Sequence, residues 1–181
     1  MFIEGLVFAI IIGYILKGKL KNLENVDIKG TNLVFISFLI EFFIVISINK
    51  GFFNIGNFTY ILDSIMYILL AIFIYFNRKN KYILLMGIGF LLNAIPIFFN
   101  GGAMPVSAKA AETAGLTLNV TKEGLYTLIN GNTRFWLLGD IIPLAVLRHF
   151  AISIGDIITG IGLMLFIITG MRKTPEIKIN K

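Results

Sequence analysis

Carboxyl groups inside apolar segments are the side chains of this sequence best placed to do chemistry. A charged group at the centre of a membrane helix costs roughly 2.5–3.5 kcal/mol to insert, so it usually faces a bundle interior or an aqueous cavity. There it can bind ions or solutes, hold a proton, or work with a second carboxyl group as acid and base. Acidic residues in or beside such segments are Glu4, Glu41, Asp63, Asp140 and Asp156.

A break in the helical pattern follows a second group of polar residues. Asn93, Pro96 and Asn100 recur at helical spacing, and the chain then reads Asn100-Gly101-Gly102-Ala103-Met104-Pro105-Val106-Ser107. Paired glycines can adopt positive φ and let another group approach the backbone, while Pro105 disfavours a helix. The break predicts one wall of an outward-facing site, and a turn that only redirects the chain is the alternative.

A short repeat occurs later in the chain. Gly139-Asp140 and Gly155-Asp156 lie sixteen residues apart, and each is predicted to open an apolar helical stretch whose exposed N–H groups the aspartate caps. Arg148 lies between them and offers a planar cation that could pair with either carboxylate. Helix capping or pairing with arginine is therefore the alternative to a binding role for these aspartates.

These observations define a candidate site without a catalytic residue. Glu41, near the middle of its helix, is a separate candidate for proton or ion handling, and a protonated carboxyl group hydrogen-bonded in the bundle is the alternative. The candidate ligand-binding residues are Asp63, Asn93, Asn100, Gly101, Gly102, Asp140, Arg148 and Asp156.

The elements that position these residues are membrane helices. Of the 181 residues, 57% are apolar and 14% charged, and the mean hydropathy is +0.87, whereas soluble domains are about 45–50% apolar. We therefore predict an all-α polytopic membrane protein with one membrane domain over residues 1–181. Five apolar runs predict transmembrane helices at 2–16, 33–48, 58–76, 82–99 and 150–170.

Residues 100–135 form a predicted external loop, long enough for a lid or binding element. Within it we expect a short helix over 108–114, capped by Ser107, and another over 122–129. The apolar segment 136–147 is too short to cross a bilayer and contains Pro143, so we predict a re-entrant or interfacial helix there.

The basic residues predict the orientation of the chain. Cytoplasmic loops of membrane proteins are enriched in Lys and Arg, which places the amino terminus outside and the carboxyl terminus in the cytoplasm. Their role as membrane anchors explains the net charge of +6 without nucleic acid. The cytoplasmic basic residues are Lys17, Lys19, Lys21, Lys29, Arg78, Lys79, Lys81, Arg172, Lys173, Lys178 and Lys181.

Several kinds of chemistry are excluded by composition. The chain has no cysteine and one histidine, His149, so disulfides, thiolate catalysis, cysteine-ligated metals and multi-histidine sites within one chain are ruled out. We expect no cofactor and no metal.

The sequence resembles the bacterial membrane proteins of domain of unknown function 5317. The resemblance rests on the run from Asn100 to Ser107, on Leu138-Gly139-Asp140 and on Ser153-Ile154-Gly155-Asp156. It implies a multi-pass protein of the bacterial cytoplasmic membrane with these motifs grouped near the external side, and it implies no activity.

Two functions fit these predictions. In the first, the protein is a non-enzymatic carrier or partner-binding subunit whose outward-facing pocket holds a solute, an ion, a lipid headgroup or a protein segment, and a carrier requires a cavity that reaches Glu41. In the second, Asp140 and Asp156 form a coupled pair in an intramembrane hydrolase of peptide or lipid bonds. We favour the first because the chain lacks a strong nucleophile, a metal cluster and a phosphate loop. Besides the lipid bilayer, a membrane-protein partner or a homo-oligomer is compatible with its small-residue helix faces.

Overall fold

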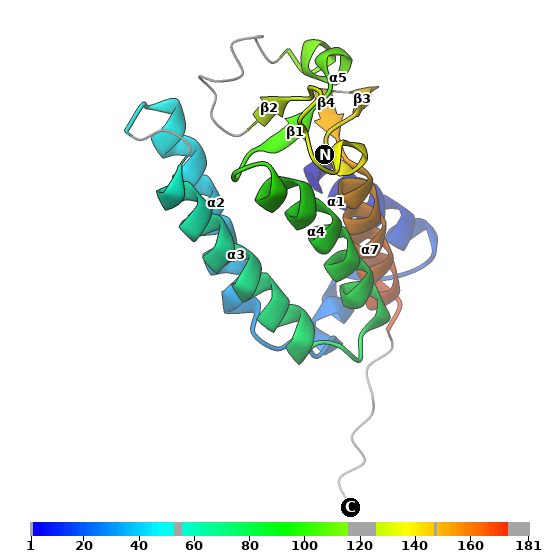
Figure 1. Cartoon of the computed structure of the whole chain (residues 1–181). Coiled ribbons are helices and arrows are strands. Elements are labelled where there is room, and N and C mark those ends of the chain that lie inside the picture. The colour runs from blue at the N-terminus through cyan, green and yellow to red at the C-terminus, as the bar shows by residue number, and fades with distance from the viewer. Residues whose placement is uncertain (1, 53–55, 116–125, 147, 174–181) are drawn as a thin grey trace, which may run out of the picture.

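Five apolar helices dominate the fold (Figure 1). The structure is a computed structural model that describes residues 2–52, 56–115, 126–146 and 148–173. Four of the helices are long and apolar enough to cross a membrane, and α1 is a shorter apolar helix. The helices are α1 (Phe2–Ile15), α2 (Thr31–Asn49), α3 (Asn57–Phe76), α4 (Lys81–Phe99) and α7 (Ile154–Met171), with a 3-10 helix η1 (Leu20–Asn25) between α1 and α2.

The outward surfaces of these helices are strongly apolar. Phe35 and Phe42 on α2 are 66% and 64% exposed, and Leu91 on α4 is 62% exposed. A soluble protein rarely exposes so many large apolar side chains, whereas helices that face lipid do, because their surface is in contact with hydrocarbon. The positions of α2, α3 and α4 match the predicted spans within two residues at each end.

Glycines allow α4 and α7 to pack closely. A Cβ atom added at Gly89 of α4 would lie 2.5 Å from the carbonyl oxygen of Gly155 and 2.7 Å from the backbone nitrogen of Thr159. A Cβ added at Gly162 would lie 2.9 Å from the backbone nitrogen of Met86. We call this contact the glycine crossing. α1 packs on α7, while α2 and α3 form a hairpin that leans away from this group (Figure 1).

A small layer of strands covers the end of α4 and the start of α7. β1 (Met104–Val106) pairs in parallel with β2 (Tyr126–Leu128), and β3 (Ile142–Val146) pairs antiparallel with β4 (Arg148–Ile152). The 3-10 helix η2 (Trp136–Leu138) and α5 (Ala108–Thr113) complete this layer, which has its own core of Val106, Ala110 and Ala111.

Local signals in the segment after α4 are confirmed. Gly101 and Gly102 have φ of 75° and 89°, as the paired glycines predict. The side chain of Ser107 accepts a hydrogen bond from the Ala110 backbone N–H and caps α5, and Gly115 has φ of 70° after it.

Three helical predictions are wrong. The segment 136–147, predicted as a re-entrant or interfacial helix, contains η2 and β3, because Pro143 has no backbone N–H for a helix interior. The last span begins at Ile154 and not at residue 150, since Ser153 caps α7 and the preceding residues form β4. Residues 126–128 of the helix predicted over 122–129 form β2, and 122–125 lie outside the described residues.

Candidate functional site

A pocket of about 410 Å³ lies between the α2–α3 hairpin, α4 and the first turn of α7, beneath the strand layer. This volume is within the range of small-molecule sites, which are commonly about 300–1,000 Å³. Much of its wall is apolar or aromatic, and these side chains include Phe38, Met66, Leu70, Phe90, Ile97, Met104 and Ile152.

Four carboxyl groups from four different elements line this pocket. Glu41 comes from α2, Asp63 from α3, Asp140 from the segment between η2 and β3, and Asp156 from α7. The described residues that line the pocket include no Lys, Arg or His. A cleft lined by one sign of charge concentrates ions of the opposite sign, so this acidic pocket is suited to a cation.

Asp156 joins α7 to α4. Its Oδ1 accepts a hydrogen bond from Asn93 Nδ2 at 2.9 Å, and its Oδ2 accepts one from the Ser153 backbone N–H at 3.0 Å. The Ser153 hydroxyl accepts from the Asp156 backbone N–H at 2.9 Å and donates to Asn93 Oδ1 at 2.7 Å. The two hydrogen bonds between Asp156 and Ser153 form a reciprocal capping box. Asp156 therefore caps α7, which is the predicted alternative to a binding role.

Replacing Asp156 with Ala is therefore expected to lower the free energy of unfolding by about 2 kcal/mol, because the Ser153 backbone N–H and Asn93 Nδ2 both lose the acceptor that the carboxylate provides. Equilibrium unfolding of the purified protein in detergent measures the change. Glu112→Ala, at an exposed acidic position on α5, is the control and should stay within about 0.5 kcal/mol of the unmodified protein. Equal stability of both variants would contradict the capping role.

Asp140 is fixed by its backbone and presents its carboxyl group to the pocket. Its N–H donates to the Pro105 carbonyl at 2.8 Å, and its carbonyl accepts from the Ser107 N–H at 3.2 Å. Gly139 makes this approach feasible, since a Cβ atom there would collide with the Pro105 carbonyl. The Gly139-Asp140 motif thus docks on the run from Asn100 to Ser107 and does not open a helix.

The carboxyl group of Asp140 differs from that of Asp156 in its bonding. Asp140 is 5% exposed, and among the described residues its Oδ1 has no hydrogen-bond partner. Burial, and to a smaller extent the Asp156 carboxylate, raises the pKa of Asp140 to about 8. This group therefore holds a proton at neutral pH.

The glycine break provides part of the pocket wall. A Cβ atom at Gly102 would lie 3.7 Å from Asp63 Oδ2, which places the carboxyl group beside the turn. Asn100 has a structural role instead, because its Nδ2 donates to the carbonyls of Pro96 and Arg134 at 2.7 and 2.8 Å. Gly101 has open space on its Cβ side and does not line the pocket.

The predicted site residues thus separate into two groups. The pocket brings together Asp63, Asn93, Gly102, Asp140 and Asp156, and Glu41 joins them. Asn100 and Gly101 lie in the adjoining turn, and the side chain of Arg148 lies outside the described residues.

The hydrogen bonds of Asp156 bear on the hydrolase alternative. That alternative requires the carboxyl oxygens of Asp140 and Asp156 to lie within hydrogen-bond reach in a water-accessible groove. Both oxygens of Asp156 accept hydrogen bonds, from Asn93 and from Ser153, so this carboxylate has a structural role.

Most of the pocket wall is not among the predicted site residues. Examples are Tyr126, which lies in a segment predicted as a helix, Met104, which the sequence assigns only to the turn, and Ser37. Ser37 lies one helical turn before Glu41 and donates to the Met66 carbonyl of α3 at 3.3 Å, so the i, i+4 spacing was a usable signal. Nothing in the sequence alone pairs Tyr126 with the Met104 strand.

The fold and pocket define a class of protein: a mostly helical chain with four helices long and apolar enough to cross a membrane and an acidic pocket at one end of them. Residues 25–168 match the family described as "Family of unknown function (DUF5317)", and the chain belongs to this family. It is similar to an "Uncharacterized protein" of Thermotoga maritima, with 30% identity over 174 residues, which cover 95% of this chain and 93% of the relative. No solved structure matches the chain.

Proposed function

We propose that this protein is a carrier-type membrane protein that binds a small organic cation in the acidic pocket. In this proposal α1 to α4 and α7 cross the bacterial cytoplasmic membrane, with the amino terminus outside and the pocket open to the outer side. The direction of successive helices alternates along the chain, and the strand layer lies at the end opposite the loop between α3 and α4 (Figure 1). That loop carries Arg78 and Lys79, which the positive-inside rule assigns to the cytoplasm.

The single observation that supports a cation is the gathering of Glu41, Asp63, Asp140 and Asp156 around one hollow whose described lining has no basic side chain. Ionised carboxyl groups close together in a partly apolar pocket repel one another, and protonation of Asp140 or a bound cation relieves this repulsion. The pocket reaches Glu41, as a carrier requires, and Glu41 also borders a shallow groove on the outer surface of α2.

The surroundings of the carboxyl groups favour an organic cation. In the described residues, no three His, Cys, Asp or Glu side chains are grouped closely enough to hold a metal ion. The acids are instead spread around walls that include Phe38, Tyr67 and Phe90. Aromatic rings and carboxylates together recognise alkylammonium groups through cation–π and charge interactions.

A binding assay on the full chain tests this proposal. The purified protein in phosphatidylcholine nanodiscs is titrated with n-butylammonium, tetramethylammonium and spermidine, with n-butanol and butyrate as neutral and anionic counterparts of similar size. We expect at least one cation to raise the melting temperature by several degrees and both counterparts to have no effect, because only a cation offsets the acidic lining.

Variants locate the binding. Asp63→Asn is expected to weaken cation binding by about tenfold or more, the effect of losing one charged contact in a partly buried site. Glu112→Gln removes an equal charge from the exposed surface of α5 and should bind like the unmodified protein. The proposal is overturned if no cation stabilises the protein more than its counterparts, or if both variants bind equally well.

A further inference from the structure

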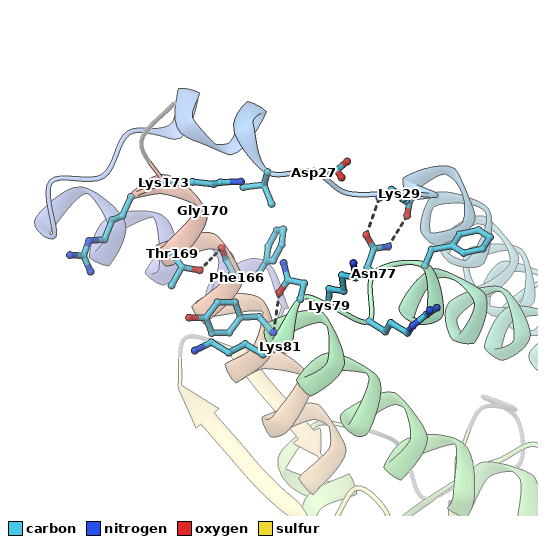
Figure 2. Close-up of a pocket in the computed structure, with 15 residues that line it drawn as sticks. Asp27, Lys29, Asn77, Lys79, Lys81, Phe166, Thr169, Gly170 and Lys173 are labelled. Atoms are coloured by element: carbon cyan, nitrogen blue, oxygen red, sulfur yellow. Dashed lines mark hydrogen bonds between the residues drawn. The ribbon is translucent and has the colours of Figure 1, made fainter. Parts of the chain in front are cut away.

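A second pocket, of about 900 Å³, lies at the opposite end of the helices from the acidic pocket. It is lined by the segment before α2, the turn between α3 and α4 with the start of α4, and the end of α7 with the two residues after it. Lys29, Lys79, Lys81 and Lys173 line this hollow and come from these separate elements (Figure 2). We call it the basic pocket.

The basic pocket has a large excess of positive charge. Asp27 is the one acidic side chain among its described lining residues, against six cations: Lys29, Arg78, Lys79, Lys81, Arg172 and Lys173. The contacts described for these cations are with neutral groups. Lys173 Nζ donates to the Asn25 carbonyl at 2.9 Å, and Lys81 lies 5.1 Å from the centre of the Tyr82 ring. Their charge is therefore available to an anion.

A buried amide holds the pocket in shape. Asn77 is 6% exposed; its Nδ2 donates to the Lys29 carbonyl at 2.7 Å, and its Oδ1 accepts from the Lys29 backbone N–H at 2.9 Å (Figure 2). Asn77 also donates to the Phe73 carbonyl at 2.8 Å, which anchors it to the end of α3. Asn80 then caps α4 by accepting from the Tyr82 N–H at 3.0 Å. The segment before α2 is thus tied to the turn that carries Lys79, and this rigid arrangement lowers the entropic cost of binding.

The lining is both basic and apolar. Val26, Phe76 and Phe166 lie among the cations, and α3 and α7 continue from this point into the apolar part of the protein. The positive-inside rule accounts for cations at this end of the helices, but it does not require them to surround one hollow. Basic pockets between membrane helices are suited to phosphate-bearing headgroups.

We infer that the basic pocket binds the phosphate group of an anionic ligand, which is either the headgroup of a membrane phospholipid or a soluble phosphate compound. The site is independent of the acidic pocket and of the cation proposed there. Lys79, Lys81 and Lys173 supply charge from three elements, and the apolar residues accommodate the part of the ligand next to the phosphate.

Two measurements distinguish the two sources of phosphate. Native mass spectrometry of the full chain, released from phosphatidylcholine nanodiscs that contain phosphatidylglycerol, reports retained lipid. Thermal unfolding in phosphatidylcholine alone, with added inorganic phosphate, reports a soluble ligand. Preferential retention of phosphatidylglycerol assigns the site to lipid, and a rise in melting temperature with inorganic phosphate assigns it to a soluble compound.

A charge-matched pair of variants tests the location. Lys79→Gln/Lys81→Gln/Lys173→Gln is expected to weaken binding by roughly 100-fold, since each cation near an anionic headgroup contributes about fivefold. Lys17→Gln/Lys19→Gln/Lys21→Gln removes the same charge near the same end but outside the pocket, and should retain the affinity. Lys79→Arg/Lys81→Arg/Lys173→Arg should also retain the affinity, which separates lost binding from lost folding.

The inference is overturned by any of three results. The first is that the unmodified protein shows neither a preference for phosphatidylglycerol nor a response to phosphate. The second is that the pocket variant binds as tightly as the unmodified protein. The third is that both glutamine variants lose the same affinity, which would indicate diffuse surface charge.

Discussion

Replacing Gly89 with Ala is expected to lower the free energy of unfolding by about 3 kcal/mol or more. The added methyl group would meet the Thr159 hydroxyl and two backbone atoms, the Gly155 carbonyl oxygen at 2.5 Å and the Thr159 nitrogen at 2.7 Å. Backbone atoms cannot rotate away, so α4 and α7 must separate. The hydrogen bond between Asn93 and Asp156, which depends on this close approach, is then strained as well.

Gly87→Ala is the matched control on the same helix. A Cβ atom there would meet only the Ile74 side chain, whose nearest atom lies 2.9 Å away and can change rotamer. Equilibrium unfolding in detergent, or melting temperature, compares the two variants. If Gly87→Ala is as destabilising as Gly89→Ala, the close contact of backbones is not the reason.

The stability of the protein is expected to fall as pH rises from about 4 to about 8 and to level off above pH 8. The pKa of Asp140 is raised to about 8 in the folded protein, whereas the unfolded chain has the ordinary value near 4. Between these values the folded state holds a proton that the unfolded state has released, so raising the pH favours unfolding. One such proton gives a slope of up to about 1.4 kcal/mol per pH unit.

Asp140→Asn should remove this part of the pH dependence, because an amide does not titrate and has nearly the same shape. Glu112→Gln, at an exposed position, should keep the dependence of the unmodified protein. The measurement is the melting temperature of each protein from pH 5 to pH 9 at constant ionic strength. Parallel profiles for Asp140→Asn and the unmodified protein would show that Asp140 is not the group that titrates.

Apolar length was sufficient to predict α2, α3 and α4, since a run of about 20 apolar residues has few alternatives to a buried or lipid-facing helix. The same criterion failed where α7 begins. Residues 150–152 continue the apolar run of the predicted span, yet they belong to β4. Ser153 and Asp156 mark the true start of α7 by the spacing of a capping box. A capping box can be recognised from four consecutive residues of the sequence. The pairing of β4 with β3, in contrast, depends on contacts between two segments, which neither segment shows by itself.

The rarity of acids in apolar segments was a good guide to the pocket. Asp63, Asp140 and Asp156 were selected on that ground, and they line one hollow together with Glu41, which sequence spacing had placed deeper in the membrane. The hydrogen-bond partners of each acid could not be predicted from the sequence. Asp156 is engaged by Asn93 and Ser153, while Asp140 has an oxygen without a partner among the described residues, and only the folded arrangement separates these two states.

The glycine crossing also bears on how the proposed cation would enter the acidic pocket. α4 and α7 meet backbone to backbone, but α3 meets α4 through aromatic side chains, with Tyr60 and Tyr67 set edge-on to Phe98 at centroid distances of 5.2 and 5.4 Å. Aromatic rings can slide and rotate, whereas backbones in direct contact have no such freedom. We therefore expect the cation to enter between α3 and α4, where the α2–α3 hairpin can move relative to α4 and α7.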